Sequence, residues 1–184
     1  MRSRPPKKTR SIPQAHPYEV IIATLNHMEP SLAKPCALMM AFCGFRPEEI
    51  RRTQKWMVTL DGDSPQVIRN TAKGGHLSAV SLVPEAILGW QMFDAHGGWE
   101  ASLADINRDW KAVMERAGFT PVKIYTLVHS FCTQLYASTG DLQMVQMTGG
   151  HADIRTTLVY TQIVADPRLA PAMTKAFGAD HASR

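Results

Sequence analysis

Apolar residues recur at helical spacing through most of the chain. The clearest case is residues 101–117, where apolar positions lie three or four residues apart and Gly118 ends the pattern. The apolar face consists of Leu103, Ile106, Trp110, Val113 and Met114. This spacing predicts an amphipathic helix with one buried face.

Further helices are predicted on both sides of this one. The first begins after Pro17 and contains Tyr18, Ile21, Ile22 and Leu25. The others cover residues 37–43, 47–52, 84–94, 125–139, 142–147, 154–163 and 170–177. Gly44 and Gly140 follow two of these helices as stop signals, and Asp141 precedes another as a cap.

The pattern changes between residues 56 and 82, where β-forming residues alternate with turn sequences. Short strands are predicted at 56–60, 66–70 and 76–82, with glycine-containing turns between them. Turns this short join neighbouring antiparallel strands. We therefore expect a mainly α fold with a small three-stranded antiparallel β-sheet, an α+β domain.

The length of 184 residues suits one domain with short tails. We place the domain at residues 17–178, a basic tail at 1–16 and a carboxy-terminal tail at 179–184. The basic tail contains prolines, lacks acidic residues and carries Arg2, Arg4, Lys7, Lys8 and Arg10. It is either an arm that follows DNA phosphates or a solvated, disordered terminus.

Composition sets further limits. The chain is 45% hydrophobic and 20% charged, so it can bury a core. Its net charge of +4 favours a polyanionic partner only mildly. Cys36, Cys43 and Cys132 lack the spacing of a disulfide framework or a metal site, which points to buried thiols in a reducing compartment.

No membrane or export segment is evident. The amino-terminal residues lack the apolar stretch of a secretory signal. The longest apolar run, residues 36–45, has about half of the roughly 20 residues that span a bilayer. We expect a soluble, cytoplasmic protein with no membrane partner.

Four positions predict phosphate chemistry. His151 and Tyr160 flank a Thr-Thr pair, and Arg46 and Lys73 lie upstream. A tyrosine can attack a phosphodiester if fixed donors neutralise the non-bridging oxygens and an acid protonates the leaving oxygen. Guanidinium suits the first task, and lysine or histidine suits the second.

The order of four motifs resembles the catalytic domain of tyrosine recombinases, the phage-integrase family. Residues 43–50 (CGFRPEEI) resemble its first box, and residues 71–75 (TAKGG) resemble its β-hairpin turn. Residues 125–131 (YTLVHSF) resemble its second box, and residues 150–161 resemble its third box and nucleophile segment. The resemblance covers roughly residues 17–178 and implies that family's fold.

The resemblance also implies roles. Tyr160 would be the nucleophile, Arg46 and His151 would stabilise the pentavalent phosphorane, and Lys73 would be the general acid. Glu49 would be the supporting carboxylate of the first box. Such a mechanism needs no cofactor or metal ion, because cationic side chains neutralise the phosphate.

Two motif positions depart from the family pattern. Val128 occupies the place of the second catalytic arginine, and Tyr125 occupies the place of the second-box histidine. Valine supplies neither charge nor donor, so we expect the chain to cleave DNA poorly or not at all. His129 is the neighbouring motif residue, and on a helix it points about 100° away from position 128. The sequence leaves open whether Arg155 or another cation fills the gap.

These motifs support three hypotheses. The first is a DNA-binding recombinase or integrase that cleaves and rejoins strands through a 3′-phosphotyrosyl intermediate, with activity impaired at Val128. The second is a catalytically inactive DNA-binding accessory or regulatory relative, and the third is an interaction domain without a DNA role. The family resemblance implies double-stranded DNA as partner, and a homo-oligomer, a tetramer on DNA, in which residues 164–184 pass to a neighbour.

Overall fold

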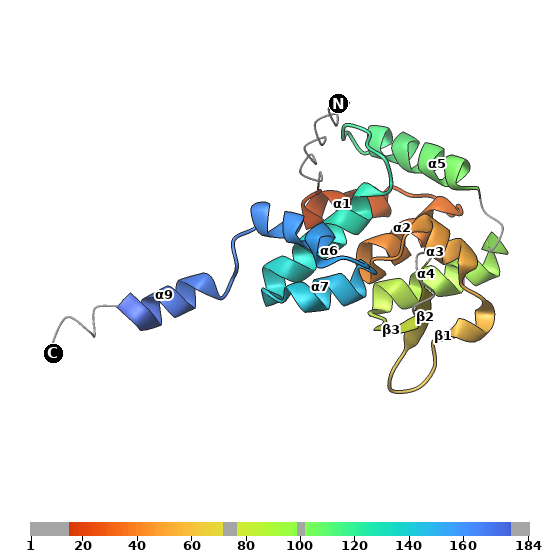
Figure 1. Ribbon diagram of the computed structural model, residues 1–184. Coiled ribbons are helices and arrows are strands. Elements are labelled where there is room, and N and C mark those ends of the chain that lie inside the picture. Colours follow the sequence, from red (N-terminus) through yellow and green to blue (C-terminus); the bar gives the residue numbers. More distant parts are fainter. Residues whose placement is uncertain (1–14, 72–76, 99–101, 178–184) are drawn as a thin grey trace, which may run out of the picture.

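A computed structural model of the protein describes residues 15–71, 77–98 and 102–177 (Figure 1). The α-helices are α1 (Tyr18–Asn26), α2 (Ala33–Cys43), α3 (Pro47–Arg52), α4 (Pro84–Ala95), α5 (Leu103–Arg116), α6 (Thr126–Thr139), α7 (Leu142–Thr148), α8 (Ile154–Thr157) and α9 (Leu169–Phe177). The 3₁₀ helices are η1 (Lys55–Met57) and η3 (Leu158–Gln162), and the strands are β1 (Val58–Thr59), β2 (Gln66–Asn70) and β3 (Leu77–Ser81).

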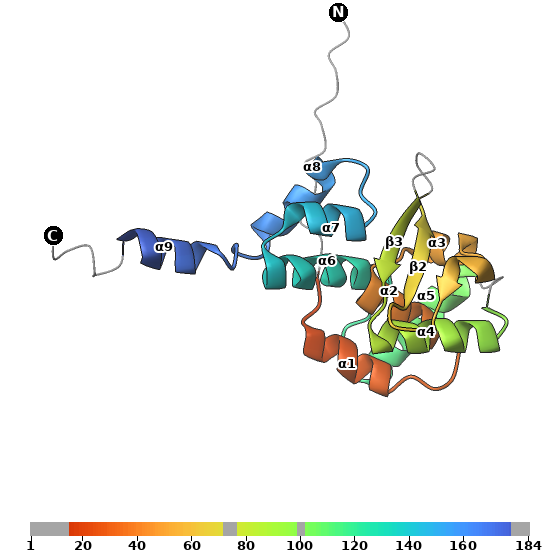
Figure 2. The same ribbon diagram turned by 90° about the horizontal axis from the view of Figure 1, so that it is seen from below.

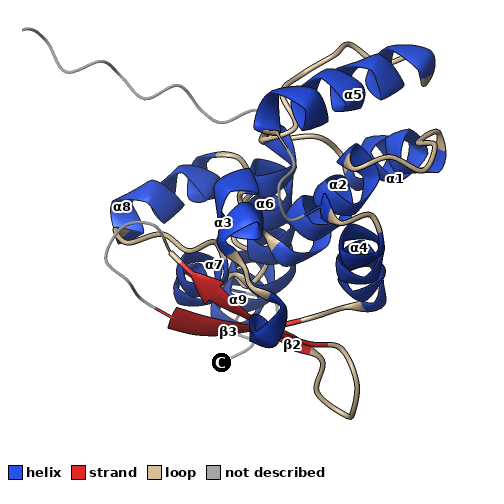
Figure 3. Cartoon of the chain, turned by 90° about the vertical axis from the view of Figure 1, so that its right-hand side faces the viewer, coloured by secondary structure: helices blue, strands red, loops and turns tan. Residues whose placement is uncertain are grey.

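The three strands form one antiparallel sheet in the order β1-β2-β3, at one edge of the helical body (Figure 3). Val58 pairs with Val67, and Gln66 pairs with Ser81. This confirms the predicted fold class. β1 is shorter than predicted because the residues before it form η1, which buries Met57.

α2 is the central helix of the main core. Nine of its eleven residues are buried, and it packs against α1, α4, α5 and α6. Gly44 ends the helix in the left-handed region at φ 68°, where a Cβ would lie 2.5 Å from the Phe131 ring. Only glycine fits this close approach without strain. The turn directs the chain into Arg46 and α3.

A second, smaller cluster lies between η3 and the helices α6 and α7, which lie side by side in Figure 2. Its buried members are Cys132, Tyr136, Val145 and Tyr160. The single helix predicted at 154–163 is instead α8 followed by η3. Thr157, the last residue of α8, and Tyr160 of η3 are both buried.

α9 stands away from the body in both views (Figures 1 and 2). Its side chains Leu169 and Met173 are exposed. No helix in the described ranges combines the length and the apolar character that crossing a bilayer requires.

Candidate active site

Arg46 lies at the start of α3, where Glu49 positions both its backbone and its side chain. The Arg46 backbone N–H donates to Glu49 Oε2 at 2.9 Å, and its Nη1 donates to Oε1 at 2.8 Å. Pro47 occupies the first helical position, which suits its missing N–H. Glu49 is buried whereas Arg46 is only partly covered, so the carboxylate orients a cation that solvent can still reach.

Arg46 also joins segments that are distant in the sequence. Its Nε donates to the Tyr125 hydroxyl at 3.0 Å, across 79 residues. Its Nη1 donates to the Gly150 carbonyl at 3.2 Å, across 104 residues. These bonds bring the start of α6 and the segment before His151 to the first-box arginine. Tyr125, predicted as a degenerate motif position, is therefore a direct partner of Arg46.

Tyr160 lies between two histidines. Its hydroxyl is 3.0 Å from His129 Nδ1. Its ring is parallel to the His151 ring, with an interplanar angle of 8° and centroids 6.1 Å apart. The side chain is only 1% exposed. Burial, followed by the Cys132 thiol, raises the pKa of the phenol well above its ordinary value, so Tyr160 is protonated near neutral pH.

Both histidines are neutral near pH 7. Burial, followed by the charge of Arg46, lowers the pKa of His151 to about 4 and also lowers the pKa of His129. His151 Nδ1 lies 2.9 Å from Thr157 Oγ1. A neutral imidazole with its proton on Nε2 accepts a hydrogen bond at Nδ1. His129 can therefore accept the proton of the Tyr160 hydroxyl.

Val128 is buried in the main core, at 1% exposure. It supplies no donor or charge to the site. Arg155 does not fill the gap, because its exposed guanidinium pairs with Asp153 at 2.6 Å. Lys73 lies outside the described residues.

Comparisons with known proteins find similarity to integrases and recombinases. The family model described as "Phage integrase family" matches residues 92–166, which include His129, His151 and Tyr160. An integrase/recombinase from Escherichia coli is 43% identical over 58 residues, which are 31% of this chain and 17% of the relative. The tyrosine recombinase XerD from Bifidobacterium longum is 46% identical over 54 residues, which are 29% of this chain and 18% of the relative.

Residues 92–166 therefore resemble the phage integrase family, which includes the tyrosine recombinases. Solved recombinase structures share its fold. XerH, in a post-cleavage complex with its palindromic difH substrate, gives a TM-score of 0.71 at 21% identity, over 89% of this chain and 53% of that one. The XerA recombinase gives a TM-score of 0.69 at 20% identity, over 95% of this chain and 67% of that one. The chain thus spans about half the length of XerH.

One charged residue beside this candidate site escaped the sequence analysis. Arg69 on β2 is 0% exposed, and its Nε lies 3.5 Å from Glu49 Oε2. A cation at an inward-facing strand position is the signal that could have identified it. That signal was ambiguous, because Val67 and Ile68 are both apolar and so did not reveal which face of the strand is buried.

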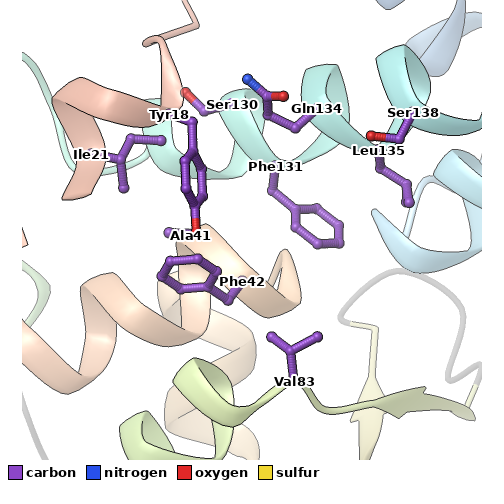
Figure 4. Close-up of a pocket in the computed structure, with 10 residues that line it drawn as sticks. All are labelled: Tyr18, Ile21, Ala41, Phe42, Val83, Ser130, Phe131, Gln134, Leu135 and Ser138. Carbon is purple, nitrogen blue, oxygen red and sulfur yellow. The ribbon is translucent and has the colours of Figure 1, made fainter.

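Two other features of the structure concern regions away from these contacts. An apolar pocket of about 200 Å³ lies between α1, α2 and α6 (Figure 4). Tyr18 and Phe42 meet edge to face beside it, and none of the candidate catalytic residues lines it. In the described ranges, no group of three or more His, Cys, Asp or Glu residues is arranged to bind a metal ion.

Proposed function

We propose that this protein binds double-stranded DNA and cleaves and rejoins one strand through a 3′-phosphotyrosyl link at Tyr160. The supporting observation is that Arg46 and His151, from separate motifs, come together with His129 around that tyrosine. Solved structures with this fold include integrases in complex with DNA, such as the Tn1549 transposon integrase with circular intermediate DNA. We assign the activity to a domain of residues 17–178.

The chemistry follows from the contacts. The Tyr160 oxygen attacks phosphorus and forms an O–P bond, while the bond from phosphorus to the 5′ oxygen breaks. The phenol proton passes to His129 Nδ1, which already lies 3.0 Å from the hydroxyl. Arg46 donates to the non-bridging oxygens, and His151 helps to stabilise the phosphorane. Lys73 would protonate the departing 5′ oxygen, as the family resemblance implies.

Val128 lowers the expected rate. An arginine that contacts a phosphoryl transition state contributes on the order of 10³–10⁵ in rate in nucleotide hydrolysis. Burial of Val128 in an apolar core means that its own side chain cannot replace that contact. We therefore propose slow cleavage, with DNA binding less affected.

A covalent-adduct assay tests the proposal. A duplex pool with a randomised centre is selected on the protein, and the recovered sequence is synthesised with a nick near the cleaved position so that rejoining is blocked. An SDS-resistant protein–DNA adduct is expected from the unchanged protein but not from Tyr160→Phe. Absence of any adduct at high protein concentration and long incubation would reject the catalytic proposal.

The second candidate function is DNA binding without catalysis, as an accessory or regulatory relative of a recombinase. Two observations favour it: Val128 at the arginine position, and the Tyr160 hydroxyl buried against His129. This candidate function predicts that the protein binds the selected duplex but never forms a covalent link to it. The affinity of the protein for the duplex should still fall steeply as the salt concentration rises, because phosphate contacts release counterions. Binding that is flat with salt, or absent, would favour an interaction domain without a DNA role.

We also propose that the protein forms a homo-oligomer on DNA. The exposed apolar side chains Leu169 and Met173 of α9, which stands away from the body, support this proposal. Light scattering of the complex between the protein and its selected duplex should give a mass that corresponds to more than one protein copy per DNA site. A single copy per site at saturation would reject it.

A further inference from the structure

Arg69 is the most deeply buried charge among the described residues, and its surroundings are specific. It projects from β2 into the core, and its guanidinium carbon lies 4.3 Å from the centre of the Phe45 ring. A buried guanidinium is costly unless its donors are satisfied. Burial accordingly lowers the pKa of Arg69, and the charge of Glu49 opposes this shift.

The Arg69 donors reach the ends of two helices. Nη2 donates to the Cys43 carbonyl at 3.0 Å, and Nη1 donates to the Thr148 carbonyl. Cys43 is the last residue of α2, and Thr148 is the last residue of α7. The final carbonyls of a helix lack intrahelical partners and carry partial negative charge. Arg69 therefore ties together the carboxy-terminal ends of α2 and α7.

Each of these helix ends leads directly to a residue of the site. Arg46 follows Cys43 by three positions, and His151 follows Thr148 by three positions. The Arg69 side chain thus contacts the chain just before the segment that leads to Arg46 and just before the segment that leads to His151. Arg69 is itself absent from the motifs that carry the family resemblance.

Glu49 connects the two arginines. Its Oε1 accepts from Arg46 Nη1 at 2.8 Å, and its Oε2 faces Arg69 Nε at 3.5 Å. Gly150 packs between the two side chains: a Cβ there would lie 3.1 Å from Arg46 Nη1 and 3.2 Å from Arg69 Cδ. Two guanidiniums therefore share one carboxylate, which leaves the group of three side chains with a net positive charge.

We propose that Arg69 is a positioning residue of the strand-cleavage site, which acts through Glu49 and the ends of α2 and α7 to set the orientation in which Arg46 meets a phosphate. The inference rests on the proposed function for its catalytic consequence. Arg69 is fully buried and does not touch the DNA. The positive charge of Arg69 also contributes to the lowered pKa of His151, after burial, Arg46 and His129.

The test compares Arg69→Lys with Arg108→Lys, a matched control on the exposed face of α5. Lysine keeps the charge but loses the planar fork that reaches two carbonyls and a carboxylate. In Arg69→Lys, the single-turnover rate of adduct formation on the nicked selected duplex should fall about 10- to 100-fold, the scale of a small misplacement of a reacting group. DNA affinity and the Arg108→Lys rate should not change.

A second readout does not depend on catalysis. The Nε–H of Arg46 is bonded to the Tyr125 hydroxyl, so its hydrogen exchange, followed by ¹⁵N NMR, reports the orientation of Arg46 directly. Exchange should accelerate in Arg69→Lys and not in Arg108→Lys. If the unchanged protein forms no adduct, the proposed function fails, and the exchange of Arg46 still decides the role of Arg69. Unchanged exchange in folded Arg69→Lys would overturn the inference, whatever the adduct rate.

If Arg69→Lys does not fold, a double variant that carries both Glu49→Gln and Arg69→Gln replaces it. Removing both charges leaves no unpaired ion between these two side chains. Faster exchange of the Arg46 Nε–H in this folded double variant than in Glu49→Gln alone would support the inference. Equal exchange in the two proteins would overturn it, because Glu49 would then position Arg46 without help from Arg69.

Discussion

The Tyr160 hydroxyl lies 3.0 Å from Nδ1 of His129, a residue that belongs to a different motif and lies 31 positions earlier. The side chain of Tyr160 is almost fully buried. The phenol is therefore oriented and its proton has a nearby acceptor, but the oxygen must come into contact with DNA before it can attack. A shift of η3 away from α6 on DNA binding would satisfy that requirement.

His129→Phe should lower the rate of adduct formation. General-base assistance contributes about 10²–10⁴ in rate, so a drop of about 10²-fold is expected when the proton acceptor is removed. The rate is measured in single-turnover assays over a range of pH. His96→Phe, on the exposed end of α4, is the matched control and should behave like the unchanged protein. Equal rates for the two variants would show that the Tyr160 proton leaves by another route.

Val128→Arg should raise the adduct rate per folded molecule while it lowers stability. Position 128 lies one helical turn before Cys132, which is buried in the same cluster as Tyr160. An arginine at position 128 therefore starts on the face of α6 that leads to the nucleophile. An uncompensated buried charge costs about 3–5 kcal/mol of unfolding free energy. Urea denaturation and the adduct assay measure the two effects.

Val128→Met is the control for Val128→Arg, because methionine adds length without charge. It should cost less stability and leave the adduct rate unchanged. A rate for Val128→Arg that is no higher than for Val128→Met would mean that another cation already serves this step, or that the site is impaired elsewhere.

Gly150→Ala should be more destabilising than Gly118→Ala. Both glycines have positive φ, 62° and 81°, so alanine costs about 1–2 kcal/mol of backbone strain at either position. Nothing lies within 4 Å of a Cβ at Gly118, whereas a Cβ at Gly150 would lie 3.1 Å from Arg46 Nη1. The difference between the two unfolding free energies measures this crowding, and Gly150→Ala should also slow adduct formation. Equal costs would show that Arg46 moves aside freely.

Stability should fall as the pH drops from about 6.5 to about 4. The pKa of His151 is lowered from 6.5 to about 4 in the folded protein, so the unfolded chain binds a proton in this range that the folded state excludes. The contribution of His151 to the free energy of unfolding is complete above its pKa in the unfolded chain, 6.5. It is lost as the pH falls toward its pKa in the folded protein, about 4. At pH 5 the loss is about 2 kcal/mol for this residue.

Denaturant titrations at pH 7 and pH 5 measure this loss. It should be smaller in His151→Asn and unchanged in His96→Gln, whose ring is exposed. The same loss in His151→Asn as in the unchanged protein would assign the pH dependence to other groups, of which His129 is the first to test, since its pKa is also lowered.

Local patterns in the sequence were sufficient for the fold class. Apolar spacing predicted the amphipathic helix that is α5, and the glycine-rich turns predicted the antiparallel sheet. These features depend on residues within a few positions of each other, so they can be read directly from the chain. The prediction of one continuous helix at 154–163 was partly wrong. The change to 3₁₀ geometry at η3 accompanies the burial of Tyr160 against α6, and local spacing does not encode that tertiary contact.

The sequence by itself determined the helical framework and named Arg46, His129, His151 and Tyr160 as residues of interest. Only the tertiary structure decided that the Tyr160 hydroxyl meets His129, that Arg46 meets Gly150, and that Arg69 lies buried behind them. The first two contacts join residues that are 31 and 104 positions apart. Their geometry is set by how α2, α6, α7 and the sheet pack around a shared core, and the packing of distant elements is not written in the spacing of neighbouring residues.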